Sequence, residues 1–188
     1  MGKIILEQKI GMKIICFGDS NTYGYDPRGY FGGRYDADSR WVDILAAATG
    51  WSVYNMGENG REIPSAAPAF PADTDLLIVM LGTNDLLQGC SPEQAAERLE
   101  HFLSALSMDQ SKILLIAPPP VTLGAWVPSA KFIENSRTFA QLCQALAERM
   151  GIRFADAGKR GVSLAYDGVH FAEQGHKAFA AGLLEELK

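Results

Sequence analysis

The chain has 188 residues, a length that suits one folded domain with one substantial core. Apolar residues make up 47% of it and charged residues 21%, which is typical of a globular protein and excludes a disordered chain. The net charge of −5 argues against a nucleic-acid-binding surface, which needs clustered Lys and Arg. Because no apolar stretch is long enough to cross a bilayer, we expect no stable membrane insertion.

The three cysteines indicate a reducing environment. Cys16, Cys90 and Cys143 are odd in number, and their spacings match no zinc site, so we predict no metal centre. Cys16 lies in an apolar run and Cys143 in a helical pattern, so both are predicted to be small buried apolar side chains. The N-terminus shows no secretory signal, and we therefore expect a cytoplasmic protein.

A second methionine divides the N-terminal region. Residues 1–11 precede Met12, which opens an apolar run. We predict a single domain over residues 12–188, with residues 1–11 either a leader or a short extra strand. We find no linker, internal repeat or second domain.

Short apolar runs alternate with longer amphipathic stretches. In chain order the pattern predicts a strand at Lys13–Phe17, a helix at about Ser39–Thr49, strands at Ser52–Asn55 and Asp75–Leu81, a helix at about Ser91–Ser107, a strand at Lys112–Ala117, a helix at about Lys131–Met150, a strand at Arg153–Ala155 and a helix at about Ala172–Leu187. The third and fourth strands are apolar throughout, as strands buried on both faces are. The pattern therefore predicts an α/β protein, a three-layer α/β/α sandwich around a five-stranded parallel sheet.

The second predicted helix has a clear start signal. Ser91 suits the N-cap, Pro92 the first helical position and Gln94 the reciprocal position of a capping box.

Small and polar residues follow the predicted strands. Gly18–Gly24 follows the first strand, Asn55–Arg61 ends and follows the second, and Gly82–Asp85 follows the third. Asp167–His170 lies just before the last helix. Because ligands bind beyond the carboxyl ends of strands in an open α/β sheet, these clusters are expected at one shared edge.

Three residues of these clusters suit nucleophilic catalysis. The Ser20 hydroxyl needs a base to take its proton. Of the three histidines, only His170 lies in a loop at the correct edge; His101 and His176 lie in helical patterns and are expected to be exposed helix residues. Asp167 precedes His170 by three residues, close enough to orient the imidazole.

Acyl transfer also needs donors for the developing oxyanion. Ser20 and Gly60 can offer backbone N–H groups, and Asn84 can offer its side-chain amide. Glycine at position 60 would let the backbone approach a substrate closely. Asp85, by contrast, is expected only to cap a helix.

Four blocks together resemble the signature of SGNH (GDSL-type) hydrolases: Gly18-Asp19-Ser20, Gly60 after Asn55, Gly82-Thr83-Asn84-Asp85, and Asp167 with His170. The blocks stand in the family's order over nearly the whole chain from Met12. The resemblance implies a flavodoxin-like sandwich, no cofactor and hydrolysis of acyl esters or thioesters. It implies that Ser20 is the nucleophile, that Asp167 and His170 complete a catalytic triad, and that Gly60 and Asn84 complete the oxyanion hole with the Ser20 N–H. The first block departs from the family in having Asn21, a polar variant beside the nucleophile, where the motif has Leu.

Further segments resemble an arylesterase or acyltransferase branch of that family. They are Arg40-Trp41, Met80–Asp85, Pro118–Pro120 and Phe154–Gly158. That branch implies small acyl groups and frequent assembly into oligomers, so a homo-oligomer stays open.

Several loop residues have two interpretations. An acyl pocket or plain loop packing would suit Tyr23, Tyr25, Phe31, Leu86, Leu87 and Trp126. Arg28, Arg34 and Arg61 are expected to be solvated loop charges, with contact to an anionic substrate as the alternative.

Other functions are weighed against a serine esterase acting on a small-molecule ester. A nucleotide- or flavin-binding module lacks its glycine motifs here, and an α/β-hydrolase would place its serine in G-x-S-x-G. A non-catalytic ligand-binding module would not need every catalytic group that is present. Within the esterases, a carbohydrate O-deacetylase is the nearest alternative, followed by a thioesterase or lysophospholipase.

Overall fold

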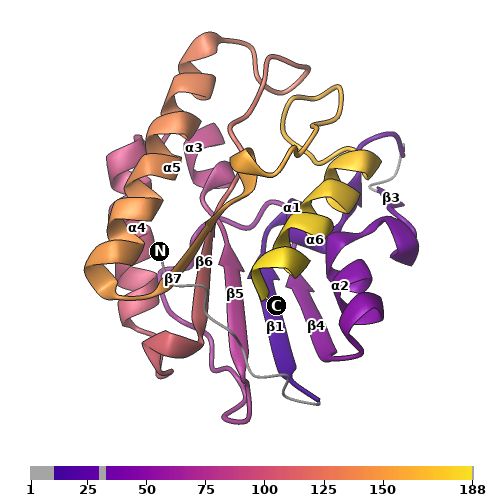
Figure 1. Cartoon of the computed structure of the whole chain (residues 1–188). Coiled ribbons are helices and arrows are strands. Elements are labelled where there is room, and N and C mark those ends of the chain that lie inside the picture. Colours follow the sequence, from indigo (N-terminus) through magenta and orange to yellow (C-terminus); the bar gives the residue numbers. More distant parts are fainter. Residues whose placement is uncertain (1–10, 30–32, 188) are drawn as a thin grey trace.

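A five-stranded parallel sheet forms the centre of the computed structural model, which describes residues 11–29 and 33–187 (Figure 1). From edge to edge its strands are β4 (Ser52–Gly57), β1 (Lys13–Gly18), β5 (Leu76–Met80), β6 (Ile113–Ala117) and β7 (Arg153–Asp156). In the register of the sheet, Ile14 of β1 pairs with Val53 on one side and Leu76 on the other. The predicted strands and their parallel pairing are confirmed.

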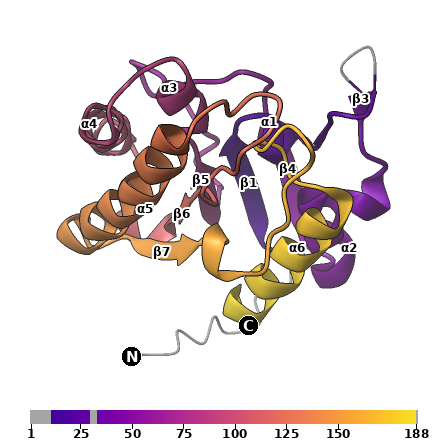
Figure 2. The same cartoon turned by 90° about the horizontal axis from the view of Figure 1, so that it is seen from above.

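Helices cover both faces of the sheet (Figure 2). One face carries α2 (Trp41–Thr49) and α6 (Glu173–Leu187), and the other carries α3 (Thr83–Leu87), α4 (Pro92–Ser104) and α5 (Ala130–Met150). Alternate residues of β1 point to opposite sides, so that Ile15 packs with the α4–α5 core and Ile14 with the α2–α6 core. This confirms the three-layer sandwich. Cys16 and Cys143 are fully buried, one in each core, as predicted.

The predicted helices form where the sequence signals placed them. Ser91 caps α4, and both hydrogen bonds of the capping box with Gln94 are present. Helix α2 begins later than expected, because a 3₁₀ turn, η1 (Ala37–Ser39), precedes it.

Several short elements escaped prediction. They are α1 (Ser20–Tyr23), the antiparallel pair β2 (Tyr25–Asp26) and β3 (Gly33–Arg34), helix α3, and the 3₁₀ turns η1, η2 (Gln110–Lys112) and η3 (Ala157–Lys159). Runs of two to five residues are too short to show a helical or strand period. The predicted leader over residues 1–11 (apart from Gly11) and Phe31 lie outside the described residues.

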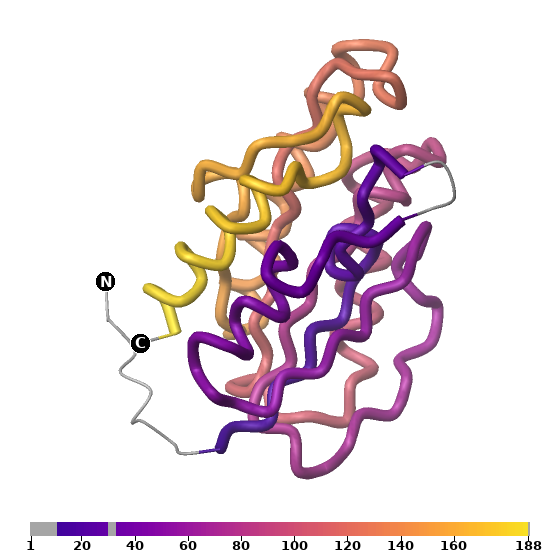
Figure 3. The backbone as a smooth tube through the Cα atoms, turned by 90° about the vertical axis from the view of Figure 1, so that its right-hand side faces the viewer, coloured from indigo at the N-terminus to yellow at the C-terminus, as the bar shows by residue number. Residues whose placement is uncertain are grey.

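Two long loops lie side by side at the carboxyl edge of the sheet, one over residues 118–129 and the other over residues 160–172 (Figure 3). The N–H of Thr122 donates to the carbonyl of Gly168 at 2.9 Å, and that of Trp126 to the carbonyl of Asp167 at 3.0 Å. A Cβ at Gly168 would lie 2.0 Å from the Thr122 oxygen, so this approach requires glycine. The loop that carries Asp167 and His170 is therefore fastened to its neighbour.

Among the helices that the structure describes, none combines the length and the apolar character needed to cross a bilayer.

Candidate active site

Ser20 lies directly beyond β1, as the first residue of α1. Asp19 caps this short helix, and its Oδ1 accepts the N–H of Asn21 at 2.9 Å. Because Ser20 opens the helix, its own N–H has no intrahelical acceptor. The hydroxyl is almost buried, with the residue 5% exposed.

The structure brings Ser20, His170 and Asp167 into one hydrogen-bonded chain. His170 Nε2 lies 2.9 Å from Ser20 Oγ, and His170 Nδ1 lies 2.6 Å from Asp167 Oδ2. A carboxylate can only accept, so Nδ1 carries the proton toward Asp167 and Nε2 accepts from the serine hydroxyl. This arrangement has the atom order that nucleophilic acyl transfer requires.

Asp167 is held as an anion. It is fully buried, and burial by itself raises the pKa of the carboxyl. The contact with the His170 ring and the backbone N–H groups of Val169 and His170, both donating to Oδ1, outweigh burial, so that its pKa lies below the ordinary value. A charged Asp167 stabilises a protonated His170.

A second buried carboxylate, Asp19, directly precedes Ser20. Asp19 is 1% exposed, and burial raises its pKa to about 6, although the Asn21 N–H and the charges of His170 and Arg61 oppose this shift. Its cap on α1 fixes the turn that presents Ser20.

Asn84 and Gly60 lie at the same edge. The side-chain amide of Asn84, in the first turn of α3, donates one hydrogen to the carbonyl of Arg61 at 3.0 Å and keeps a second hydrogen for another acceptor. In the described part of the chain no acceptor takes the Gly60 N–H. The φ of Gly60 is +76°, a conformation that L side chains rarely adopt, and a Cβ there would touch nothing. The glycine is thus needed for backbone shape.

Arg61 is not the solvated charge that we predicted from the sequence. Its side chain is 17% exposed, donates to the carbonyls of Gly18 (2.8 Å) and Met56, and pairs with Glu58. The guanidinium also lies over the Phe17 ring, 4.3 Å from its centre. Because Arg61 bonds to the ends of β1 and β4, it holds the segment that carries Gly60 against β1, the strand that leads to Ser20.

The prediction that Asp85 only caps a helix is wrong. Gly82 occupies the N-cap of α3, with no side-chain cap bond. Asp85 is fully buried and accepts the N–H of Ile63 at 3.0 Å and an Arg98 hydrogen at 3.0 Å. It therefore ties the segment after Gly60 to α3.

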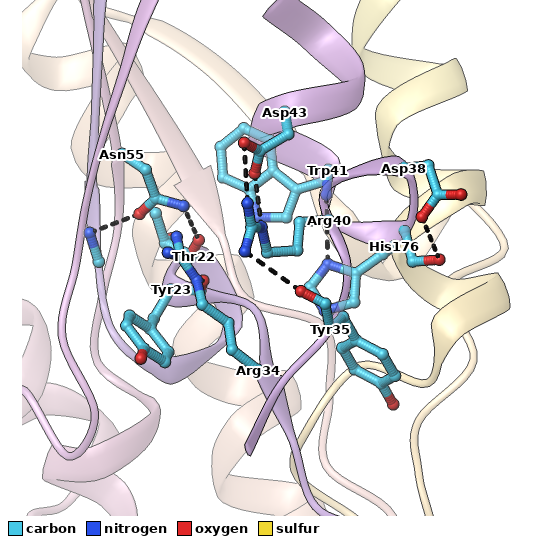
Figure 4. Close-up of polar contacts among 12 residues, drawn as sticks. Thr22, Tyr23, Arg34, Tyr35, Asp38, Arg40, Trp41, Asp43, Asn55 and His176 are labelled. Carbon is cyan, nitrogen blue, oxygen red and sulfur yellow. Dashed lines mark hydrogen bonds and ion pairs between the residues drawn. The ribbon is translucent and has the colours of Figure 1, made fainter. Parts of the chain in front are cut away.

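His176 was expected to be exposed but is fully buried. Figure 4 shows its ring beneath the start of α2, where its Nδ1 accepts the N–H of Trp41 at 3.5 Å. Tyr35 and Phe171 surround the ring. Burial lowers the pKa of His176 to about 3, aided by the charges of His170 and Arg40, so the imidazole is neutral and structural. His101 is exposed, as predicted.

Figure 4 also shows how α1 is fastened to the sheet. Asn55 of β4 donates to the carbonyl of Thr22 at 2.8 Å and accepts the N–H of Gly57 at 2.9 Å. Arg34 donates to the carbonyl of Tyr23 and covers its ring. The residues after Ser20 are thus held from several directions.

The predicted pocket residues separate into groups. Tyr25 and Trp126 flank the His170 ring, with centres 4.5 and 5.1 Å from it. Leu86 and Leu87 line an apolar cavity of about 10 Å³ together with Thr83, Pro118, Pro119, Val121, Phe132, Ser136 and Phe139. Tyr23 packs on Arg34 instead. No group of three or more His, Cys, Asp or Glu side chains in residues 11–29 and 33–187 is arranged to hold a metal ion.

The family follows from the comparison of this chain with known proteins. The model of the GDSL-like lipase/acylhydrolase family matches residues 16–178, which include all four blocks. The chain belongs to this family. As an SGNH hydrolase it is a carboxylic ester hydrolase, as the sequence blocks predicted.

Solved structures support the same conclusion. A candidate arylesterase from Agrobacterium tumefaciens str. C58 is 30% identical over 93% of this chain and 97% of its own, with a TM-score of 0.78. The native aryl esterase of M. smegmatis is 26% identical, over 94% and 98% of the two chains, with a TM-score of 0.79. A carbohydrate acetylesterase family member from Sinorhizobium meliloti is 25% identical, over 94% and 99%, with a TM-score of 0.78. None of the curated proteins compared with the chain is significantly similar to it.

Proposed function

We propose that this SGNH hydrolase cleaves small, short-chain acyl esters through an acyl intermediate on Ser20. The observation that supports it is the buried chain of hydrogen bonds from Ser20 through His170 to Asp167, at 2.9 and 2.6 Å. Such a chain lets a neutral imidazole remove the serine proton as the nucleophile attacks. A non-catalytic binding module has no need of it.

In the first half of the proposed reaction, Ser20 Oγ forms a bond to the ester carbonyl carbon and its proton passes to His170 Nε2. The carbonyl oxygen becomes an oxyanion, which the N–H groups of Ser20 and Gly60 and the free hydrogen of Asn84 stabilise. Loss of one such donor typically costs about 2.7–4 kcal/mol. The bond to the leaving oxygen then breaks as that oxygen takes the proton from His170.

In the second half, water attacks the acyl-serine and gives its proton to His170. Collapse of the second oxyanion breaks the bond to Ser20 Oγ, which regains the proton, and the acid is released. Asp167 stays ionised throughout, in keeping with its lowered pKa, and stabilises the imidazolium formed in each half.

One relative supports a short acyl group. The S. meliloti protein is a carbohydrate acetylesterase family member, and acetyl is a two-carbon acyl group. This likeness favours a short-chain esterase over a lysophospholipase or long-chain thioesterase.

A carbohydrate O-deacetylase is the second candidate, because the S. meliloti relative is a carbohydrate acetylesterase family member. Both candidates transfer an acetyl group to serine and differ in the alcohol released. Comparing kcat/KM for phenyl acetate and for an acetylated sugar separates them.

The test is a series of p-nitrophenyl esters of increasing chain length, assayed with the wild type, Ser20→Ala and Ser111→Ala. Ser111 lies at the opposite edge of the sheet, just before β6, and serves as the matched control. We expect Ser20→Ala to lose at least about 10³-fold in kcat and Ser111→Ala to keep full activity. Equal activity of all three proteins would refute the nucleophile, and rates that rise toward long chains would refute the short acyl group.

We further propose that residues 12–188 form one domain and that the protein is cytoplasmic, acts without a cofactor and binds no nucleic acid. The acidic net charge argues against nucleic-acid binding, and the unpaired cysteines suit a reducing compartment such as the cytoplasm.

A further inference from the structure

Asn21, the residue that departs from the family motif, lies between Ser20 and the His170 loop. It is 3% exposed. Its Nδ2 donates to the carbonyl of Val169 at 3.2 Å, and its Oδ1 accepts the N–H of Phe171 at 2.8 Å. One side chain therefore bonds to the backbone on both sides of His170.

Asn21 is itself held in place. Its backbone N–H donates to Asp19 at 2.9 Å, and its carbonyl accepts the indole N–H of Trp41 at 3.0 Å. With its side chain fixed as well, Asn21 has little freedom to rotate or shift.

Among the residues that the structure describes, no other polar side chain bonds to the backbone of both Val169 and Phe171. Asp167 fixes the His170 ring, but both residues belong to one turn, so their bond cannot set the distance from that turn to Ser20. In the described part of the chain, the Ser20–His170 bond and the two Asn21 bonds are the only hydrogen bonds between residues 19–24 and 167–171. The serine–histidine bond must break and re-form during catalysis, whereas the Asn21 bonds need not.

The chemistry requires an amide at this position. The carbonyl of Val169 needs a donor and the N–H of Phe171 needs an acceptor, and a carboxamide supplies both. The Leu of the motif supplies neither, and an aspartate supplies only the acceptor.

We propose that Asn21 is a positioning residue that sets the distance between the His170 imidazole and the Ser20 hydroxyl. This rests on the proposed function, in which His170 moves the proton. A misplacement of a catalytic group by about 1 Å can cost about 100-fold in rate. Asn21→Leu should therefore lower kcat by roughly 10- to 100-fold, with KM for phenyl acetate within about twofold of the wild type.

A double-mutant cycle with His170→Ala tests this role. If Asn21 acts through His170, Asn21→Leu has no further effect once the imidazole is removed. In the His170→Ala background it should therefore lower kcat by less than about twofold. An equal loss of kcat in both backgrounds would overturn the positioning role and leave the proposed function intact. A His170→Ala protein with wild-type kcat would overturn the proposed function and this role with it.

Two more variants distinguish an effect of positioning on kcat from an effect of lowered stability. Asn21→Asp keeps the acceptor for Phe171, so it should fold and lose less activity than Asn21→Leu if positioning decides the rate. Thr49→Val removes two hydrogen bonds at the opposite edge of the sheet, to Leu45 and from Trp51, and should lower stability while kcat stays within about twofold. A kcat that falls as far in Thr49→Val as in Asn21→Leu would contradict the proposal.

Discussion

Replacing Arg61 by Met tests whether this side chain holds the two strand ends together. Methionine keeps an apolar chain over the Phe17 ring but removes the donors to Gly18 and Met56 and the charge that meets Glu58. The substitution therefore breaks the contacts between the end of β1, which leads to Ser20, and the segment that carries Gly60, with little change of packing.

The size of the effect follows from these contacts. A hydrogen bond from a charged donor contributes about 1.5–3 kcal/mol, and a partly buried cation over a ring about 0.5–2 kcal/mol. The bond to Glu58, which is 68% exposed, adds at most about 1 kcal/mol. The Gly18 carbonyl also keeps a hydrogen bond from the Glu58 N–H at 3.1 Å. The bond to Met56 and the contact with the ring are then the main losses, so we expect Arg61→Met to lower the free energy of unfolding by about 2–5 kcal/mol.

Urea denaturation measures this change, and steady-state kinetics with phenyl acetate measures kcat. We expect kcat to fall by roughly tenfold, because Asn84 donates to the Arg61 carbonyl and Gly60 is its neighbour. Arg149→Met is the matched control, since it removes an exposed ion pair with Glu100 and should cost under about 1 kcal/mol. If Arg61→Met lowers the free energy of unfolding no more than the control does and leaves kcat unchanged, Arg61 does not hold the ends of β1 and β4 together.

Two further predictions concern the acidic and imidazole groups. Asp167→Asn should leave the fold intact but reduce kcat by as much as about 10⁴-fold, because an amide favours the wrong imidazole tautomer; a loss under tenfold in a steady-state assay would argue against the triad. Because the pKa of folded His176 is lowered from 6.5 to about 3, the unfolded chain binds a proton first as the pH falls, so the stability due to neutral His176 is present above about pH 6.5 and lost below it. Between pH 7 and pH 5 the loss in the free energy of unfolding amounts to about 2 kcal/mol. Urea denaturation of His176→Phe should show a pH dependence smaller by that amount. An unchanged pH dependence would show that His176 is not the group responsible.

The fold was predictable because its signals are local and strong. Uniformly apolar strands such as β5 can exist only between two layers, and the capping box at Ser91 marks a helix start by chemistry within four residues. Helix α1 and the β2–β3 pair have no such signal, because four and two residues span only about one period of a helical or strand pattern, and a pattern must repeat to be recognised. They form where tertiary contacts, such as the bond from Asn55 to Thr22, fix the backbone.

Two of the errors at single residues share one cause. His176 and Arg61 were assigned to the surface because ionisable groups are mostly exposed. Position in the sequence alone does not show that two aromatic rings, Tyr35 and Phe171, pack against His176, nor that Arg61 bonds to two strand-end carbonyls. Burial of an ionisable group depends on partners that lie far away in the chain.

The chemical groups of the site and the side chains that align them differ in how far a sequence can reveal them. A hydroxyl, an imidazole and a carboxylate at one sheet edge can be recognised by residue type, so Ser20, His170 and Asp167 could be named in advance. The aligning side chains bind backbone atoms instead: Asn21 bonds to the Val169 carbonyl and the Phe171 N–H, and Arg61 to the Gly18 and Met56 carbonyls. Every residue offers a carbonyl, and all but proline offer an N–H, so the partner's identity leaves no mark in the sequence. The alignment of such a site thus depends on hydrogen bonds from side chains to backbone groups. Because a backbone group is the same in almost every residue, a three-dimensional structure is needed to find these bonds.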